Sequence, residues 1–158
     1  TKQLTKEYPN SDKYDDLIAV WTDYFSKKFN RNPIEPNCIK ALIASESGFR
    51  VDPKGNNIAI GITQITKQTL IILKDPKGES KDFIFKGIVQ KDLKKPEIAI
   101  PLAIRWLYRK QDTARSKLGR NPKHEEIILE YKGWLNGHSA LRDKGLKNYR
   151  EHYAKLKK

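Results

Sequence analysis

The sequence predicts a single, mostly α-helical domain, and three observations lead to this prediction. The length of 158 residues is usual for one domain and suffices to bury a hydrophobic core without disulfides. Apolar residues recur every three or four positions through most of the chain. No repeat or low-complexity linker divides the chain, and its aromatic residues, at 9%, argue against disorder.

The first long helix is predicted over residues 12–30, before the turn-rich stretch "RNPIEP". We expect residues 1–35 to form an N-terminal helical extension of a domain that covers residues 1–158. The apolar stripe predicted for this helix consists of Leu17, Trp21, Tyr24 and Phe25.

The next two helices are predicted from their end signals. Residues 35–47 contain Pro36, which is tolerated in a first turn, and are followed by Gly48, which suits a C-terminal cap. The loop "VDPKGNN" comes next, and a helical pattern then resumes over residues 61–74.

The second half of the chain is also predicted to be mostly helical. Residues 75–95 lack a clear period, so we expect a small irregular or β element there. A long helix is predicted over residues 95–118, with Pro101 early enough to be tolerated. Two further helices, at residues 122–135 and 139–158, flank an Asn-Gly turn. The buried face of the long helix should consist of Ile100, Ala103, Ile104 and Leu107.

The chain is strongly basic, with a formal net charge of +13. Such a charge attracts polyanions, whether nucleic acid, an anionic membrane surface or an anionic cell-wall polymer, but it does not select among them. No apolar run reaches the length of about 18 residues that a membrane span needs. Cys38 is the only cysteine, so it has no intrachain disulfide partner, and a small buried residue is the favoured interpretation.

Glu46 occupies an unusual position in the helix predicted over residues 35–47. Ile39, Leu42 and Ile43 form an apolar stripe, and the next place on that stripe is Glu46. A carboxylate in a last turn faces the negative end of the helix dipole, and partial burial also favours the neutral, protonated form. A carboxylic acid that keeps its proton can protonate a glycosidic oxygen. The alternative is a glutamate that turns to solvent or pairs with a lysine.

Three ordered motifs give Glu46 a context. "ASESGF" is followed by "AIGITQIT" and later by "ILEYKGW". This set resembles the motifs of SLT-type lytic transglycosylases and of their goose-type lysozyme relatives, over roughly residues 36–156. The resemblance implies a lysozyme-like, mostly α fold and an enzyme that acts on peptidoglycan.

The resemblance also implies roles for individual residues. Glu46 matches the catalytic acid/base, and Ser47 matches the serine that helps to shape the site. Gly61 and Gln64 match the second motif, whose glutamine contacts a substrate sugar. Tyr131 matches the tyrosine that hydrogen-bonds near the catalytic carboxyl group.

The sequence departs from the family pattern at several places. Thr63 stands where an apolar residue is usual. Glu130, Lys132 and Gly133 replace much of the third motif, whose asparagine is missing. These departures leave the glutamate intact, but they also permit a non-catalytic protein that kept the fold.

In the chemistry that the resemblance implies, Glu46 alone cleaves the β-1,4 bond between N-acetylmuramic acid (MurNAc) and N-acetylglucosamine (GlcNAc), and a 1,6-anhydro-MurNAc product forms without a metal or cofactor. The first alternative is a goose-type lysozyme that hydrolyses the same bond with a positioned water. Asp52 is the candidate second carboxylate, although an aspartate before Pro53 commonly serves a turn. The other alternative is a non-catalytic basic domain that binds wall polymers or nucleic acid.

Three further expectations complete the prediction. His124, His138 and His152 are far apart in sequence, so we expect each at the surface and no metal site. The expected partners are peptidoglycan glycan strands, with anionic wall polymers as a second candidate, whereas nucleic acid is not favoured. A peptidoglycan substrate implies an extracytoplasmic location (periplasm, cell wall or secreted) or a phage virion.

Overall fold

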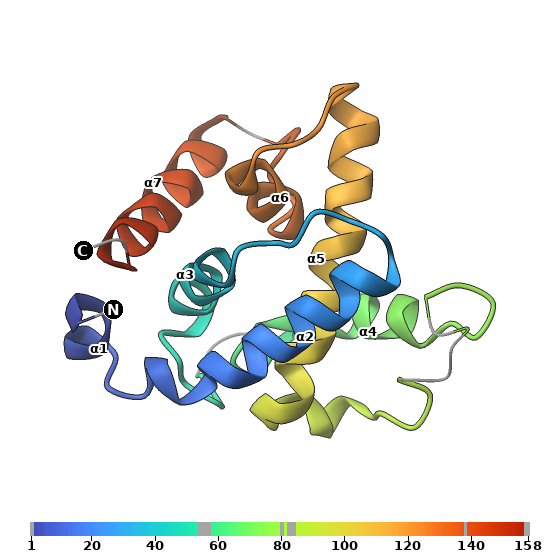
Figure 1. Cartoon of the computed structure of the whole chain (residues 1–158), viewed down its shortest axis with the longest axis horizontal. Coiled ribbons are helices and arrows are strands. Elements are labelled where there is room, and N and C mark those ends of the chain that lie inside the picture. Colours follow the sequence, from blue (N-terminus) through green and yellow to red (C-terminus); the bar gives the residue numbers. More distant parts are fainter. Residues whose placement is uncertain (1, 54–57, 80, 82–84, 138, 157–158) are drawn as a thin grey trace.

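A buried helix, α3 (Pro36–Ser47), lies at the centre of the molecule, as the computed structural model shows (Figure 1). The structure describes residues 2–53, 58–79, 81, 85–137 and 139–156. The helix begins with Pro36 in its first turn and ends at Gly48 in the left-handed conformation (φ 59°), as predicted. Helices α2, α6 and α7 pack around it. The buried residues of α3 are Cys38, Ile39, Lys40, Ala41, Leu42, Ile43, Ala44 and Ser47.

The N-terminal helices are α1 (Lys2–Glu7) and α2 (Asp15–Lys28), with a short 3₁₀ helix, η1 (Ser11–Tyr14), between them. Helix α1 packs on α7, and α2 packs on α5. The predicted stripe of α2 is wrong in detail, because only Phe25 of its four members is buried; Leu17 and Trp21 are half-buried and Tyr24 is exposed. The packing of α2 on α5 and α3 buries a neighbouring face that includes two hydroxyl residues. The buried residues are Ile18, Thr22, Phe25 and Ser26.

A small hairpin replaces the first turns of the helix predicted over residues 61–74. Strands β1 (Ala59–Ile60) and β2 (Ile65–Thr66) pair antiparallel, with Ala59 opposite Thr66 and Ile60 opposite Ile65. The prediction of helix here is wrong because the backbone of the connecting turn is left-handed at Gly61 (φ 77°) and at Gln64 (φ 54°).

Helix α4 (Lys67–Lys74) begins only after this hairpin, where the Thr66 side chain accepts a hydrogen bond from the Thr69 backbone N–H at 3.1 Å. Of the two structures expected for residues 75–95, the irregular one is present. The described part of this stretch forms turns and a 3₁₀ helix, η2 (Gln90–Lys94), and contains no strand.

Helix α5 (Pro96–Leu118) is the longest and agrees with its prediction almost residue for residue. Its expected inner face is buried, with Ile100, Ile104 and Leu107 at 0% exposure and Ala103 at 1%. Pro101 lies within the helix, and Gly119 caps the other end in the left-handed conformation (φ 67°).

The last two helices, α6 (His124–Tyr131) and α7 (Ser139–Leu156), pack against each other and against α3. Helix α6 is shorter than predicted because the backbone turns left-handed at Gly133 (φ 76°). The expectation that His152 is at the surface is wrong. His152 is 7% exposed; its Nδ1 donates to the Asn148 carbonyl at 2.8 Å, and its Nε2 accepts from the Tyr8 hydroxyl at 2.9 Å.

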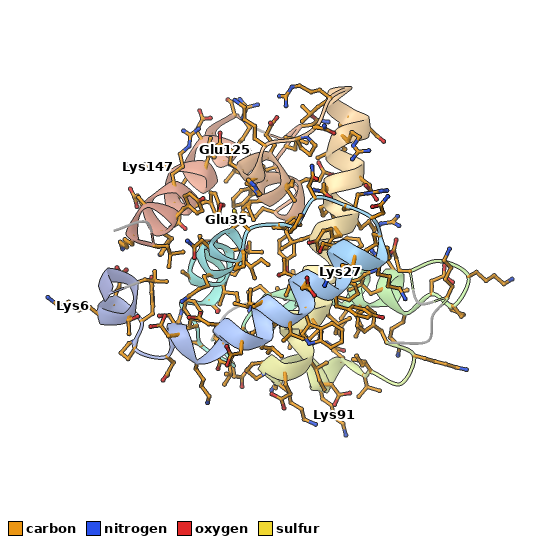
Figure 2. All side chains as sticks on the ribbon, in the orientation of Figure 1. Lys6, Lys27, Glu35, Lys91, Glu125 and Lys147 are labelled. Carbon is orange, nitrogen blue, oxygen red and sulfur yellow. The ribbon has the colours of Figure 1, made fainter. Side chains whose placement is uncertain are left out.

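The positive charge is distributed over the molecule. The exposed residues Lys6, Lys27, Lys91 and Lys147 lie at well-separated places on it (Figure 2). Among the described helices, none combines the length and the apolar character that crossing a bilayer requires.

Candidate functional site

Glu46 lies in the last turn of α3, and its side chain is 19% exposed. Its Oε1 accepts a hydrogen bond from Nζ of Lys132, only 2.6 Å away. The same Nζ donates to the Ser45 hydroxyl at 3.0 Å, and the Lys132 side chain is 8% exposed. Glu46 is therefore the half-buried member of an ion pair, which is one of the alternatives that the sequence left open.

Tyr131 connects the end of α6 to the β1–β2 hairpin. Its hydroxyl donates to the Thr63 carbonyl at 2.8 Å. Burial raises the pKa of Tyr131 well above its usual value, and the negative charge of Glu46 raises it further. Tyr131 is therefore a neutral donor close enough to Glu46 to be affected by its charge.

Ser47 joins the end of α3 to the same hairpin. Its side chain is 1% exposed, and its hydroxyl donates to the Ile62 carbonyl at 2.7 Å, with the Ile43 carbonyl at 3.3 Å as a second neighbour. This bond holds the hairpin turn against the helix end that carries Glu46.

Gly61 and Gln64 form the two ends of the hairpin turn. A Cβ on Gly61 would lie 1.9 Å from the Leu93 carbonyl oxygen, so the turn packs directly on the backbone of η2. Gln64 Nε2 donates to the Gly61 carbonyl at 2.9 Å, which folds the side chain back over the turn. Both residues lie beside the end of α3, but no described contact joins either of them to Glu46.

The departures from the family motifs have structural explanations. Thr63 is fully buried, and its hydroxyl donates to the Ala99 carbonyl at 3.3 Å, so a polar residue is satisfied at an otherwise apolar place. Glu130 is 5% exposed and pairs with Lys117 at 2.7 Å. Lys132, which stands in place of the motif asparagine, pairs with the candidate catalytic carboxylate.

Asp52 lies apart from this group. Its side chain is 65% exposed, and its described partner is Lys94, with 3.5 Å between Oδ2 and Nζ. No described contact brings it to Glu46. Asp52 therefore forms a solvent-exposed ion pair at the surface.

A cavity of about 480 Å³ opens along α5. Glu79 lies within it and bonds to both Arg105 and Arg109, which attaches the irregular stretch after α4 to the long helix. Burial lowers the pKa of Arg105 to about 10. Glu46, Gln64 and Tyr131 are not among the residues that line this cavity.

Sequence reasoning missed Lys132 as a partner of Glu46. Lys132 stood out in the sequence as a departure from the third motif. Its partner could not be read there, because Glu46 and Lys132 are 86 residues apart in the chain. The potential metal ligands that the described residues bring together lie at the opposite end of α3 and not at Glu46.

Three features define a mostly α, lysozyme-like domain. They are a central buried helix with a glutamate in its last turn, a short hairpin packed on that end and a tyrosine from a later helix. The chain belongs to the SLT transglycosylase family, because the family model described as "Transglycosylase SLT domain" matches residues 23–156. The match includes all three motifs, and it assigns the chain to a lytic transglycosylase type of protein that acts on peptidoglycan. Comparisons with curated proteins and with solved structures gave no match.

Proposed function

We propose that this chain is a peptidoglycan lytic transglycosylase in which Glu46 is the single acid/base residue. The observation that carries the proposal is the position of Glu46 in a chain of this family. It is a half-buried carboxyl group at the end of the central helix, beside Tyr131 and the hairpin that Ser47 fixes. The proposed substrate is the β-1,4 bond between MurNAc and GlcNAc.

In the proposed reaction, protonated Glu46 gives its proton to the bridging oxygen as the bond to the anomeric carbon breaks. The acetamido oxygen of the same MurNAc captures that carbon. Glu46, now ionised, then removes the proton of the C6 hydroxyl, and O6 replaces the acetamido oxygen. The 1,6-anhydro ring closes, Glu46 is protonated again and no water is consumed.

Lys132 imposes a condition on this reaction. Its Nζ lies 2.6 Å from Oε1 of Glu46, the carboxyl group that must meet the bridging oxygen of the glycan. We propose that glycan binding displaces the ammonium group from Glu46. Two neighbours remain available to it, the Ser45 hydroxyl at 3.0 Å and the ring of Trp134, whose centroid lies 5.7 Å away.

Ser47, Gly61, Gln64 and Tyr131 are proposed to form the substrate-binding part of the site. Ser47 and Gly61 would act by holding the hairpin in place, as their packing suggests. Tyr131 would orient Glu46 without adding charge. Gln64 would contact a sugar after leaving its bond to the Gly61 carbonyl.

The remaining proposals concern the domain, its partners and its location. We propose one domain over residues 1–158 with residues 1–35 as a helical extension, which the packing of α1 on α7 and of α2 on α5 supports. A net charge of +13 would draw the protein to anionic wall polymers, and nucleic acid is not a favoured partner. An extracytoplasmic or virion location would give access to the wall.

One observation favours the second candidate function, a non-catalytic protein that binds the wall. In the Glu46–Lys132 ion pair, Lys132 occupies the carboxyl group on which glycan cleavage depends. Hydrolysis in the manner of a goose-type lysozyme receives no such support, because Asp52 pairs with Lys94 at the surface.

Digestion of purified peptidoglycan, followed by mass spectrometry of the products, tests the proposal. We expect anhydro-muropeptides, which are lighter by one water than hydrolysed ones. Glu46→Gln should lower the rate by at least about 100-fold, the lower end of what general acid–base catalysis contributes. Glu151→Gln, the same change at an exposed glutamate, should leave the rate unchanged.

Circular dichroism of each variant would verify that it is folded. An active Glu46→Gln protein would refute the role of Glu46. Hydrated products would establish the hydrolase, and an inactive wild-type protein that still binds the wall would establish the binding protein.

A further inference from the structure

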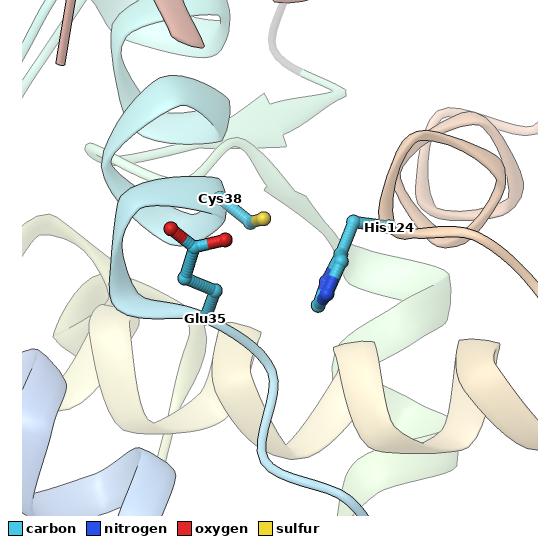
Figure 3. A group of neighbouring side chains, drawn as sticks. All are labelled: Glu35, Cys38 and His124. Carbon is cyan, nitrogen blue, oxygen red and sulfur yellow. The ribbon is translucent and has the colours of Figure 1, made fainter. Parts of the chain in front are cut away.

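Three potential metal ligands meet where the N-terminal ends of α3 and α6 lie side by side (Figure 3). Glu35 is the N-cap residue of α3, Cys38 lies in the first turn of that helix, and His124 is the first residue of α6. One ligand atom from each residue lies within 4.8 Å of the other two. The sequence gave no indication of this cluster, because His124 is remote from the other two residues along the chain.

The three side chains differ in burial in a way that would admit an ion. Cys38 is 1% exposed, Glu35 is half-buried and His124 is exposed. An ion could enter past the imidazole and reach the thiol behind it. Ligands on a tetrahedral zinc ion lie roughly 3 to 4 Å apart, as bond lengths of about 2.0 to 2.3 Å require. Binding therefore needs a shift of about 1 Å, which an exposed histidine side chain can make.

Two tyrosines of α7 hold the buried ligands from behind. The Tyr153 hydroxyl donates to Glu35 Oε2 at 2.6 Å. The Tyr149 side chain hydrogen-bonds to the side chain of Cys38. Outer hydrogen bonds of this kind fix ligand atoms around protein-bound metals.

The charges around the cluster also suit a cation. The thiolate is the form of cysteine that binds a metal. A thiolate and a carboxylate together supply two negative charges. These outweigh the effect of the positive helix ends, which is a fraction of an elementary charge each.

We propose that Glu35, Cys38 and His124 bind one zinc ion, with a water molecule at the fourth position. Sulfur, imidazole nitrogen and carboxylate oxygen form a donor set that zinc accepts. Binding would release the proton of the Cys38 thiol to solvent. The ion would join α3 to α6, the two helices whose opposite ends carry Glu46 and Tyr131.

The test uses the whole chain without a histidine tag, reduced and freed of metal. Titration calorimetry should give one zinc ion per chain, and zinc should raise the midpoint of thermal unfolding. Cobalt(II), used as a spectroscopic substitute, should produce a thiolate-to-cobalt charge-transfer band. His124→Ala, a change at an exposed side chain, should weaken zinc binding by at least about tenfold, since even outer partners contribute that much. Cys38→Ser should abolish the band.

Glu125→Gln provides the matched control, because Glu125 is adjacent to His124 but is not in the cluster and instead pairs with Arg150. It should bind zinc as the wild type does. Absence of the charge-transfer band in the wild type, or unchanged zinc affinity in both His124→Ala and Cys38→Ser, would overturn the proposal. Zinc binding should persist in Glu46→Gln, so the metal site and the proposed catalytic function can fail independently.

Discussion

At the residue scale, Oε1 of Glu46 and Nζ of Lys132 lie 2.6 Å apart, and the proposed reaction must break this contact. Both side chains are largely shielded from water, at 19% and 8% exposure, so the pair is screened less than a surface ion pair would be. In the proposed reaction, the glycan therefore replaces a shielded contact, and Lys132 is the residue that has to move.

The variant Lys132→Asn introduces the amide that is typical of the family motif and removes the ammonium group. The glycan then has no ammonium group to displace from Glu46, so cleavage should be faster than in the wild type at a low concentration of peptidoglycan. The measurement is the initial rate of peptidoglycan solubilisation.

Lys94→Asn is the control for Lys132→Asn, since it makes the same change in an exposed pair, between Lys94 and Asp52. Its rate should match that of the wild type. An unchanged rate in Lys132→Asn would show that the ion pair does not limit catalysis. A faster rate in Lys94→Asn would instead implicate Asp52.

At the element scale, the hairpin of β1 and β2 is the part of the chain that brings the second motif to the end of α3. Ser47 bonds to its turn from one side, and Tyr131 bonds to it from another. The hairpin also rests on η2, because Gly61 contacts the Leu93 backbone. The irregular stretch that contains η2 is itself attached to α5 by Glu79 through Arg105 and Arg109.

Gly61→Ala should destabilise the protein by at least about 3 kcal/mol, the combined effect of a left-handed backbone and a clash within a packed turn. The left-handed φ of 77° is unfavourable to alanine, and its Cβ would lie 1.9 Å from the Leu93 carbonyl oxygen. Urea denaturation measures the loss of unfolding free energy.

Gly119→Ala separates the two causes. Gly119 has a similar φ of 67°, but no atom lies within 4 Å of the added Cβ. It should lose only about 1–2 kcal/mol, the effect of the backbone conformation alone. Equal losses in the two variants would mean that the contact between the hairpin and η2 is not tight.

At the scale of the whole molecule, the buried tyrosines connect the helices into one core. The Tyr108 hydroxyl of α5 donates to the Thr22 carbonyl and accepts from the Ile34 N–H, while Tyr149 of α7 packs against α3. Burial is the first cause of a raised pKa in each of six tyrosines. These are Tyr8, Tyr14, Tyr108, Tyr131, Tyr149 and Tyr153.

The raised values predict unfolding at alkaline pH. A phenol whose pKa is higher in the folded state keeps its proton there, while the unfolded chain loses it near pH 10. The stabilisation is therefore complete below about pH 10 and is lost as pH rises above it. For each such tyrosine, the unfolding free energy should fall by about 1.4 kcal/mol per pH unit as the pH rises, until the pKa of the folded state is reached. Urea denaturation across that pH range measures the slope.

Tyr149→Phe should reduce this slope, whereas Tyr24→Phe should not, since Tyr24 is 40% exposed. Stability that is independent of pH above about 10 would contradict the prediction. An identical slope in Tyr149→Phe and the wild type would show that Tyr149 titrates equally in both states.

The sequence by itself determined the features that depend on near neighbours. Pro36 and Gly48 delimited α3, and the spacing of apolar residues selected the buried face of α5. Glu46 was identified because it interrupts such a pattern. Caps and periodicity arise from contacts between residues three or four apart, so a single sequence is enough to read them.

Only the tertiary structure decided which distant residues meet. It selected the buried face of α2, buried His152 against Tyr8, and formed a hairpin where helical spacing was present. It also placed Lys132 on Glu46 and His124 beside Cys38. Such contacts depend on how packed helices return past one another, which no local pattern specifies, because each helix offers several faces and its partners select one.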